Sequence, residues 1–83
     1  MTYELTQHAA DALADRCIPP EWMEQALASP TLVEPDRADP RLRHHLRPIA
    51  ERGNRILRVV LDPTAAPVRI ITVYFDRKMK GRL

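Results

Sequence analysis

Residues 55–75 read RILRVVLDPTAAPVRIITVYF, and this stretch decides the fold class. Two runs rich in Val, Ile and Leu, at 55–62 and 68–75, flank a short link that contains two prolines. Strands rich in β-branched residues around such a turn are typical of an antiparallel β-hairpin. We therefore expect two neighbouring strands in the C-terminal half of the chain.

Further strands are expected upstream of the hairpin. Polar and apolar residues alternate over residues 41–49, and a short apolar run follows Pro30 at 31–34. The links at 50–54 and 63–67 are short, which favours antiparallel neighbours. The sequence thus predicts an antiparallel meander of three to four strands.

The N-terminal part has helical instead of alternating spacing. Thr6 is a suitable cap for a helix over about residues 6–16, and Pro19 and Pro20 end that helix and open a second one over about residues 20–29. We predict an α+β fold, with both N-terminal helices packed on one face of the sheet. We treat residues 1–83 as a single domain whose residues 77–83 form a frayed tail.

Composition narrows the class of protein. No apolar run approaches the ~20 residues needed to cross a bilayer, and the first ten residues lack the order of a signal peptide, so we expect a cytoplasmic protein without a membrane partner. Cys17 is the single cysteine, so no internal disulfide is expected. With two glycines and no phosphate-binding loop motif, no nucleotide cofactor is expected.

Charge is distributed unevenly along the chain. Residues 1–39 carry eight acids and two bases, net −6, whereas residues 40–83 carry three acids and eleven bases, net +8. A basic half indicates a polyanionic partner such as RNA. An acidic partner protein, pairing within the fold, or a composition bias toward arginine would explain the same charge, so these interpretations stay open.

Alternation along the strands also predicts the two faces of the sheet. We expect Ile71, Val73 and Phe75 on the side of the helices, with Ile70 opposite them. If the more apolar sets face the helices, the opposite face gathers a group of polar residues: Arg43, His45, Arg47, Arg58, Thr72 and Tyr74. Such a face can bind a phosphodiester and move protons without a metal ion. It is equally compatible with a solvated sheet surface, and Val60 and Ile70 on it suggest cover by another chain and hence an oligomer.

Three further residues are candidates for the site. His8 and Arg16 lie near opposite ends of the first predicted helix, where one surface can present both. His44 falls on the core side by parity, although the sequence does not decide which of His44 and His45 faces the site. Adjacent strand residues point apart, so these two do not readily share a zinc ion, and no metal is expected.

The order of several short motifs resembles the domain-of-unknown-function family 4258. The resemblance rests on His8 with Arg16, on Ile18, Trp22, Leu27 and Pro30, and on the strands RILRVVLD at 55–62 and ITVY at 71–74. That family is similar to the BrnT and RelE group of small bacterial ribonuclease toxins, which have two helices followed by a curved antiparallel sheet. The resemblance therefore implies this architecture, with His8, Arg16, Arg58 and Tyr74 at matching polar positions, and His44 or His45 at a further one.

Three functions remain in competition. The first is a metal-independent ribonuclease of a toxin–antitoxin pair, with RNA as substrate and an acidic antitoxin as partner. Its catalytic residues would be His8, His45, Arg58 and Tyr74, and its RNA-binding residues Arg16, Arg43, Arg47 and Thr72. The second is a module that binds protein or nucleic acid without turnover, and the third is a domain that keeps the fold but has no chemistry.

Overall fold

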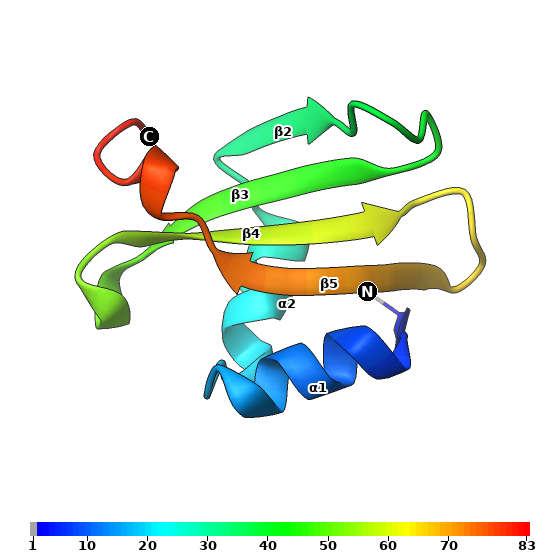
Figure 1. Ribbon diagram of the computed structural model, residues 1–83, viewed down its shortest axis with the longest axis horizontal. Coiled ribbons are helices and arrows are strands. Elements are labelled where there is room, and N and C mark those ends of the chain that lie inside the picture. Colours follow the sequence, from blue (N-terminus) through cyan, green and yellow to red (C-terminus); the bar gives the residue numbers. More distant parts are fainter. Residues whose placement is uncertain (1) are drawn as a thin grey trace.

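The computed structural model describes residues 2–83 and shows an α+β fold (Figure 1). Its helices are α1 (Gln7–Asp15) and α2 (Pro20–Ala28), with short 3-10 helices η1 (Ala50–Arg52) and η2 (Arg77–Met79). Its strands are β1 (Tyr3–Leu5), β2 (Leu32–Pro35), β3 (Arg43–Ile49), β4 (Arg55–Asp62) and β5 (Val68–Phe75). The last segment, predicted as a frayed tail, thus begins with the ordered turn η2.

The sheet has five strands in the order β1-β5-β4-β3-β2, and β1 runs parallel to β5. The predicted meander of three to four antiparallel strands is therefore wrong, although the α+β class is confirmed. The prediction missed β1 because three residues are too few to show alternation. In addition, its partner lies more than sixty residues away along the chain, so no local turn signal announces the pairing.

Side-chain contacts hold β1 at the edge of the sheet. The Thr6 hydroxyl donates to the Ile71 carbonyl oxygen at 3.0 Å and accepts from the Ala9 amide at 3.1 Å, so one residue both caps α1 and ties it to β5. The Tyr3 hydroxyl donates to a Glu24 carboxylate oxygen at 2.7 Å. That hydrogen bond favours the protonated phenol and raises the pKa of Tyr3 to about 12.

The helices are separated by a sharp reversal. Cys17 has a positive φ of 52°, and the Ile18 amide donates back to the Leu13 carbonyl at 2.9 Å, which closes the end of α1. Pro20 then occupies the first turn of α2, where its missing N–H costs nothing. Among residues 2–83, no helix is long and apolar enough to cross a membrane.

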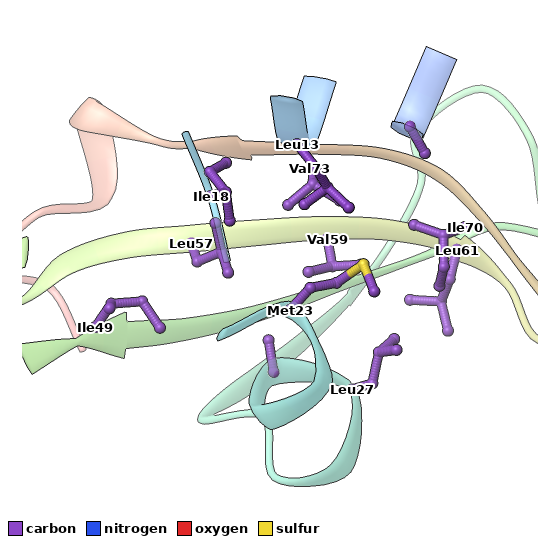
Figure 2. Close-up of a cluster of buried hydrophobic side chains, with 12 residues drawn as sticks. Leu13, Ile18, Met23, Leu27, Ile49, Leu57, Val59, Leu61, Ile70 and Val73 are labelled. Atoms are coloured by element: carbon purple, nitrogen blue, oxygen red, sulfur yellow. The ribbon is translucent and has the colours of Figure 1, made fainter. Parts of the chain in front are cut away.

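Both helices pack on one face of the sheet, and Figure 2 shows their side chains meeting those of β4 and β5. This core consists of Ala9, Leu13, Ile18, Met23, Ala26, Leu27, Ile49, Leu57, Val59, Leu61, Ile70 and Val73. Burial of a large aliphatic side chain is worth roughly 1.5–3 kcal/mol. The helix-covered face therefore supplies much of the stabilisation. The opposite face combines buried apolar side chains, at Leu46, Ile56 and Val60, with polar ones such as Arg58.

A β-bulge between β4 and β5 changes the predicted faces. Val60 pairs with Thr72 but Leu61 pairs with Ile70, so Ile71 is an extra residue in β5. Ile70 is consequently fully buried in the core, and the prediction that placed Ile71 there with Ile70 opposite is wrong. Beyond the bulge, Thr72 and Tyr74 keep the predicted side, opposite the helices.

Candidate functional site

Arg58 is the centre of a polar network on the sheet face opposite the helices. It is only 9% exposed, although it carries a permanent charge. Its Nε and Nη2 lie 3.0 and 2.8 Å from Oδ2 of Asp76. Its Nη1 lies 3.4 Å from a Glu34 carboxylate oxygen and 2.8 Å from Nδ1 of His44. Every nitrogen of this guanidinium group therefore has a partner within the protein.

The tautomer of His44 follows from these contacts. Because a guanidinium group can only donate, Nδ1 of His44 accepts and the ring proton lies on Nε2. Nε2 then donates to Oδ1 of Asp36 at 2.7 Å. This bond, with further bonds from the Asp39 and Ala38 amides, holds the pKa of Asp36 below its usual range. His44 thus uses both ring nitrogens in internal hydrogen bonds.

A pocket of about 440 Å³ opens beside this network. Its charged lining mixes Glu34, Asp36 and Asp76 with Arg37, Arg58 and Lys78, and Tyr74 completes one side. The acids and bases largely compensate one another. This pocket therefore has no strong preference for an anion.

A second pocket has a different character, and we call it the arginine pocket. It has a volume of about 300 Å³ and is lined by Arg16, Arg52, Arg55, Tyr74, Phe75 and Arg77. Among residues 2–83, no carboxylate oxygen lies within 4.0 Å of any of these four arginines. Four arginines thus line one cavity, and none of them has an acid within ion-pair distance.

The fold brings these arginines together from separate elements. Arg16 ends α1, Arg77 follows β5, and Arg52 and Arg55 flank the tight turn that joins β3 to β4. Gly53 and Asn54 in that turn have positive φ values of 62° and 61°. Glycine and asparagine adopt this conformation at the lowest cost, so the residue pair between the arginines suits the turn that brings Arg52 and Arg55 to one pocket.

Aromatic rings hold two of the arginines in place. The Arg55 guanidinium carbon lies 4.8 Å from the centre of the Phe75 ring, and that of Arg52 lies 5.1 Å from the Trp22 ring. Trp22 in turn meets Phe75 edge to face at 6.4 Å. Arg52 also donates to the Cys17 carbonyl oxygen at 2.9 Å. Cation–π contacts of this kind orient the charge and leave many N–H donors available.

The residues proposed from the sequence do not form one site. Arg58, Thr72 and Tyr74 lie on the face opposite the helices, whereas Arg43, His45 and Arg47 lie on the side of the helices. The pairing shows this directly, because Leu46 is opposite Arg58 and His45 is opposite Val59. The predicted grouping of all six is therefore wrong. Alternation fixes which residues share a face, but the register between strands decides which face meets the helices.

Internal contacts occupy several of these side chains. Arg43 donates to the Pro40 and Leu42 carbonyl oxygens at 3.0 Å, and Arg47 donates to the Ser29 carbonyl oxygen at 2.7 Å. His45 Nδ1 lies 3.1 Å from the Ala26 carbonyl oxygen. His8 Nε2 lies 3.1 Å from Oγ1 of Thr72, and neither residue lines the arginine pocket. Of the proposed residues, only Arg16 and Tyr74 line that pocket.

Sequence reasoning missed Arg52, Arg55 and Arg77. Arg52 and Arg77 lie in the 3-10 helices η1 and η2, and Arg55 is the first residue of β4, whereas alternation assigns a face only inside a strand. A signal was nevertheless present: Arg52-Gly53-Asn54-Arg55 is a turn sequence with a cation on each side, and Arg77 follows the last strand after a single residue.

One comparison with known proteins gives a match. The model of the family described as "Domain of unknown function (DUF4258)" matches residues 5–75, which confirms the resemblance drawn from the motifs. No curated protein and no solved structure matches the chain. The further similarity to ribonuclease toxins is not supported by these comparisons and stays a prediction.

Proposed function

The chain belongs to the DUF4258 family, and we propose that this member binds single-stranded RNA through the arginine pocket. The observation that carries the proposal is the convergence of four arginines without a nearby carboxylate. A cation that already has an acidic partner gains little from a phosphate, as Arg58 illustrates. The unpaired arginines of the pocket gain a full charge-assisted interaction.

RNA fits the pocket better than a simple anion does. A guanidinium group can donate two parallel hydrogen bonds to phosphate oxygens. Unpaired bases also stack on guanidinium planes and on aromatic rings. The pocket has both components, since Tyr74 lines it beside the arginines, and the Arg55 guanidinium plane lies over Phe75. An acidic protein segment offers carboxylates but no bases, so it would use the charge of the pocket and leave its rings unused.

RNA cleavage has less geometric support than RNA binding. Of the four residues proposed as catalytic, Tyr74 alone lines the arginine pocket, and His8 and His45 lie elsewhere. A proton acceptor for the 2′-hydroxyl is therefore lacking among the pocket residues. RNA cleavage is therefore measured alongside binding, in the same mixtures.

The test is fluorescence anisotropy with a labelled single-stranded RNA of about 12 nucleotides, a length that spans the usual site sizes. We expect binding whose affinity falls with salt, with a slope reduced by about 0.7 for each arginine contact removed. The Arg55→Ala/Arg77→Ala variant should lose most of the affinity. The matched control, Arg37→Ala/Arg69→Ala, removes the same charge at residues that do not line the arginine pocket.

Three results would contradict the proposal. They are an absence of RNA binding, an equal loss in the control variant, and stronger competition by an acidic peptide than by unlabelled RNA. Gel analysis of the same mixtures reports cleavage. If RNA is cut, and Tyr74→Phe abolishes the cutting while binding persists, the domain is an enzyme as well as a binder.

A further inference from the structure

The arginine pocket has a direct neighbour at the start of β4. This second cavity, of about 410 Å³, is lined by Arg55, Phe75, Asp76, Arg77 and Lys80. It shares Arg55, Phe75 and Arg77 with the arginine pocket. The two cavities therefore meet along a common wall that contains two cations and one aromatic ring. We call this second cavity the Lys80 pocket.

Resting on the proposed function, we propose that the two cavities together bind a dinucleotide step of single-stranded RNA. The phosphate that links the two nucleotides lies at the shared wall, against Arg55 and Arg77. One nucleotide occupies the arginine pocket and the next occupies the Lys80 pocket.

The sizes of the cavities support this arrangement. Volumes of about 300 and 410 Å³ lie at the lower end of the ~300–1,000 Å³ range of small-ligand sites. Each cavity is thus comparable in size to one nucleotide-sized group. A ligand that fills both must have two such units joined by a short linker, as in a dinucleotide.

The charges place the linking phosphate at the shared wall. In the Lys80 pocket the only acid is Asp76, whose Oδ2 accepts from Arg58 and whose Oδ1 accepts from the Lys78 amide. Both oxygens are therefore engaged away from Arg55 and Arg77. A phosphate between these two arginines meets two cations, and the charge of the neighbouring Asp76 carboxylate is offset by its ion pair with Arg58.

The recessed rings require an unpaired strand. Phe75 is half-buried, and its ring already contacts Arg55, Arg52 and Trp22. A base at the shared wall therefore stacks on the guanidinium plane of Arg55 that lies over this ring, and it must leave its own stack to do so. In a duplex the bases are paired inside and present only phosphates and shallow groove edges. A single strand therefore gains stacking in addition to charge, whereas a duplex gains charge alone.

Competition against labelled RNA tests the inference with three unlabelled ligands: adenosine monophosphate, the dinucleotide ApA and a short RNA duplex. A mononucleotide carries more charge than ApA, so a simple anion site prefers the mononucleotide. We expect ApA to compete about tenfold better, because stacking of one additional base is worth a factor of this order. The duplex should compete less well than the same strand unpaired.

Lys80→Ala sharpens the test, because Lys80 lines the Lys80 pocket and not the arginine pocket. This exposed residue lies after η2, so its substitution leaves the core untouched. In this variant ApA should compete less well against the labelled RNA, whereas competition by the mononucleotide should be unchanged. Better competition by the mononucleotide, equal competition by the duplex, or equal weakening of both small ligands in Lys80→Ala would overturn the inference. These results would leave RNA binding itself intact, whereas a failure of the labelled RNA to bind would overturn both proposals.

Discussion

Arg55 and Arg58 lie on the same strand, three residues apart, and have opposite surroundings. Arg58 is buried on the face opposite the helices, where Asp76, Glu34 and His44 contact its guanidinium group. Arg55 is half-buried at the strand end, stacked on Phe75, and among residues 2–83 no carboxylate oxygen lies within 4.0 Å of it. The same residue type in one strand is thus structural at one position and available for a ligand at the other.

The difference arises from desolvation. A buried guanidinium group loses its water and needs charged and hydrogen-bonding partners to offset the cost, and these partners then occupy its donors. An arginine over an aromatic ring is held by a weaker, less directional interaction and keeps most of its donors. Charge counts along a sequence therefore overestimate the cations that are available to a ligand.

The largest expected effect is on stability, at Arg58. Arg58→Met leaves Asp76 without its guanidinium partner, and we expect the free energy of unfolding to fall by about 3 kcal/mol, at the lower limit for breaking a buried ion pair. Urea denaturation measures the change. The matched variant Arg55→Met should lose less than about 1 kcal/mol, the scale of an exposed cation–π contact. Equal losses of unfolding free energy in the two variants would contradict the difference between a structural Arg58 and an available Arg55.

The next effect is on RNA binding, at Arg55. We expect Arg55→Ala to lower the affinity for single-stranded RNA about tenfold and to reduce the salt slope by roughly 0.7. Arg69→Ala is the control, because Arg69 is exposed on β5 and lines neither the arginine pocket nor the Lys80 pocket. Titrations at several salt concentrations supply both numbers. An unchanged slope in Arg55→Ala would mean that this side chain does not contact phosphate.

A smaller effect is expected at the turn that brings Arg52 and Arg55 to one pocket. Gly53 has a φ of 62°, and a Cβ atom there would meet nothing within 4 Å, so Gly53→Ala adds backbone strain without a clash. We expect a loss of about 1 kcal/mol in unfolding free energy and a modest loss in RNA affinity. If thermal unfolding of Gly53→Ala matches the wild type, the turn does not depend on glycine.

The smallest effect concerns acid stability near Arg58. The pKa of Asp36 is lowered in the folded protein, chiefly by the hydrogen bond from His44, so its contribution to stability is present above the ordinary value of 3.8 and is lost as pH falls through the lowered value. Asp36→Asn should therefore flatten the decline in stability over this acidic range. Urea midpoints of both proteins across that range provide the measurement, and parallel curves would show that Asp36 is not coupled to folding.

Particular residues show how far the sequence predicts this molecule. The hairpin strands β4 and β5 occupy 55–62 and 68–75, the ranges that the alternation predicts, because their signal is local and strong. β1 is invisible from the sequence, since its three residues pair in parallel with a strand at the far end of the chain. Ile70 and Ile71 exchange sides because a bulge leaves no mark in the alternation pattern.

The candidate site was harder to predict than the fold. The sequence indicates Tyr74 and Arg16, which do line the arginine pocket, but it equally indicates Arg58, whose guanidinium group is engaged inside the protein. Its partners Asp76 and Glu34 lie 18 and 24 residues away in sequence. The availability of an arginine is a property of the packed structure, which no local pattern encodes.

We propose that RNA contacts Arg55 and its neighbours in the arginine pocket, and not Arg58. Nuclear magnetic resonance of the arginine Nε–H groups in isotope-labelled protein tests it in one titration with single-stranded RNA. We expect the signals of Arg52, Arg55 and Arg77 to shift or broaden while that of Arg58 stays in place. A shift of the Arg58 signal with unchanged pocket signals would contradict it.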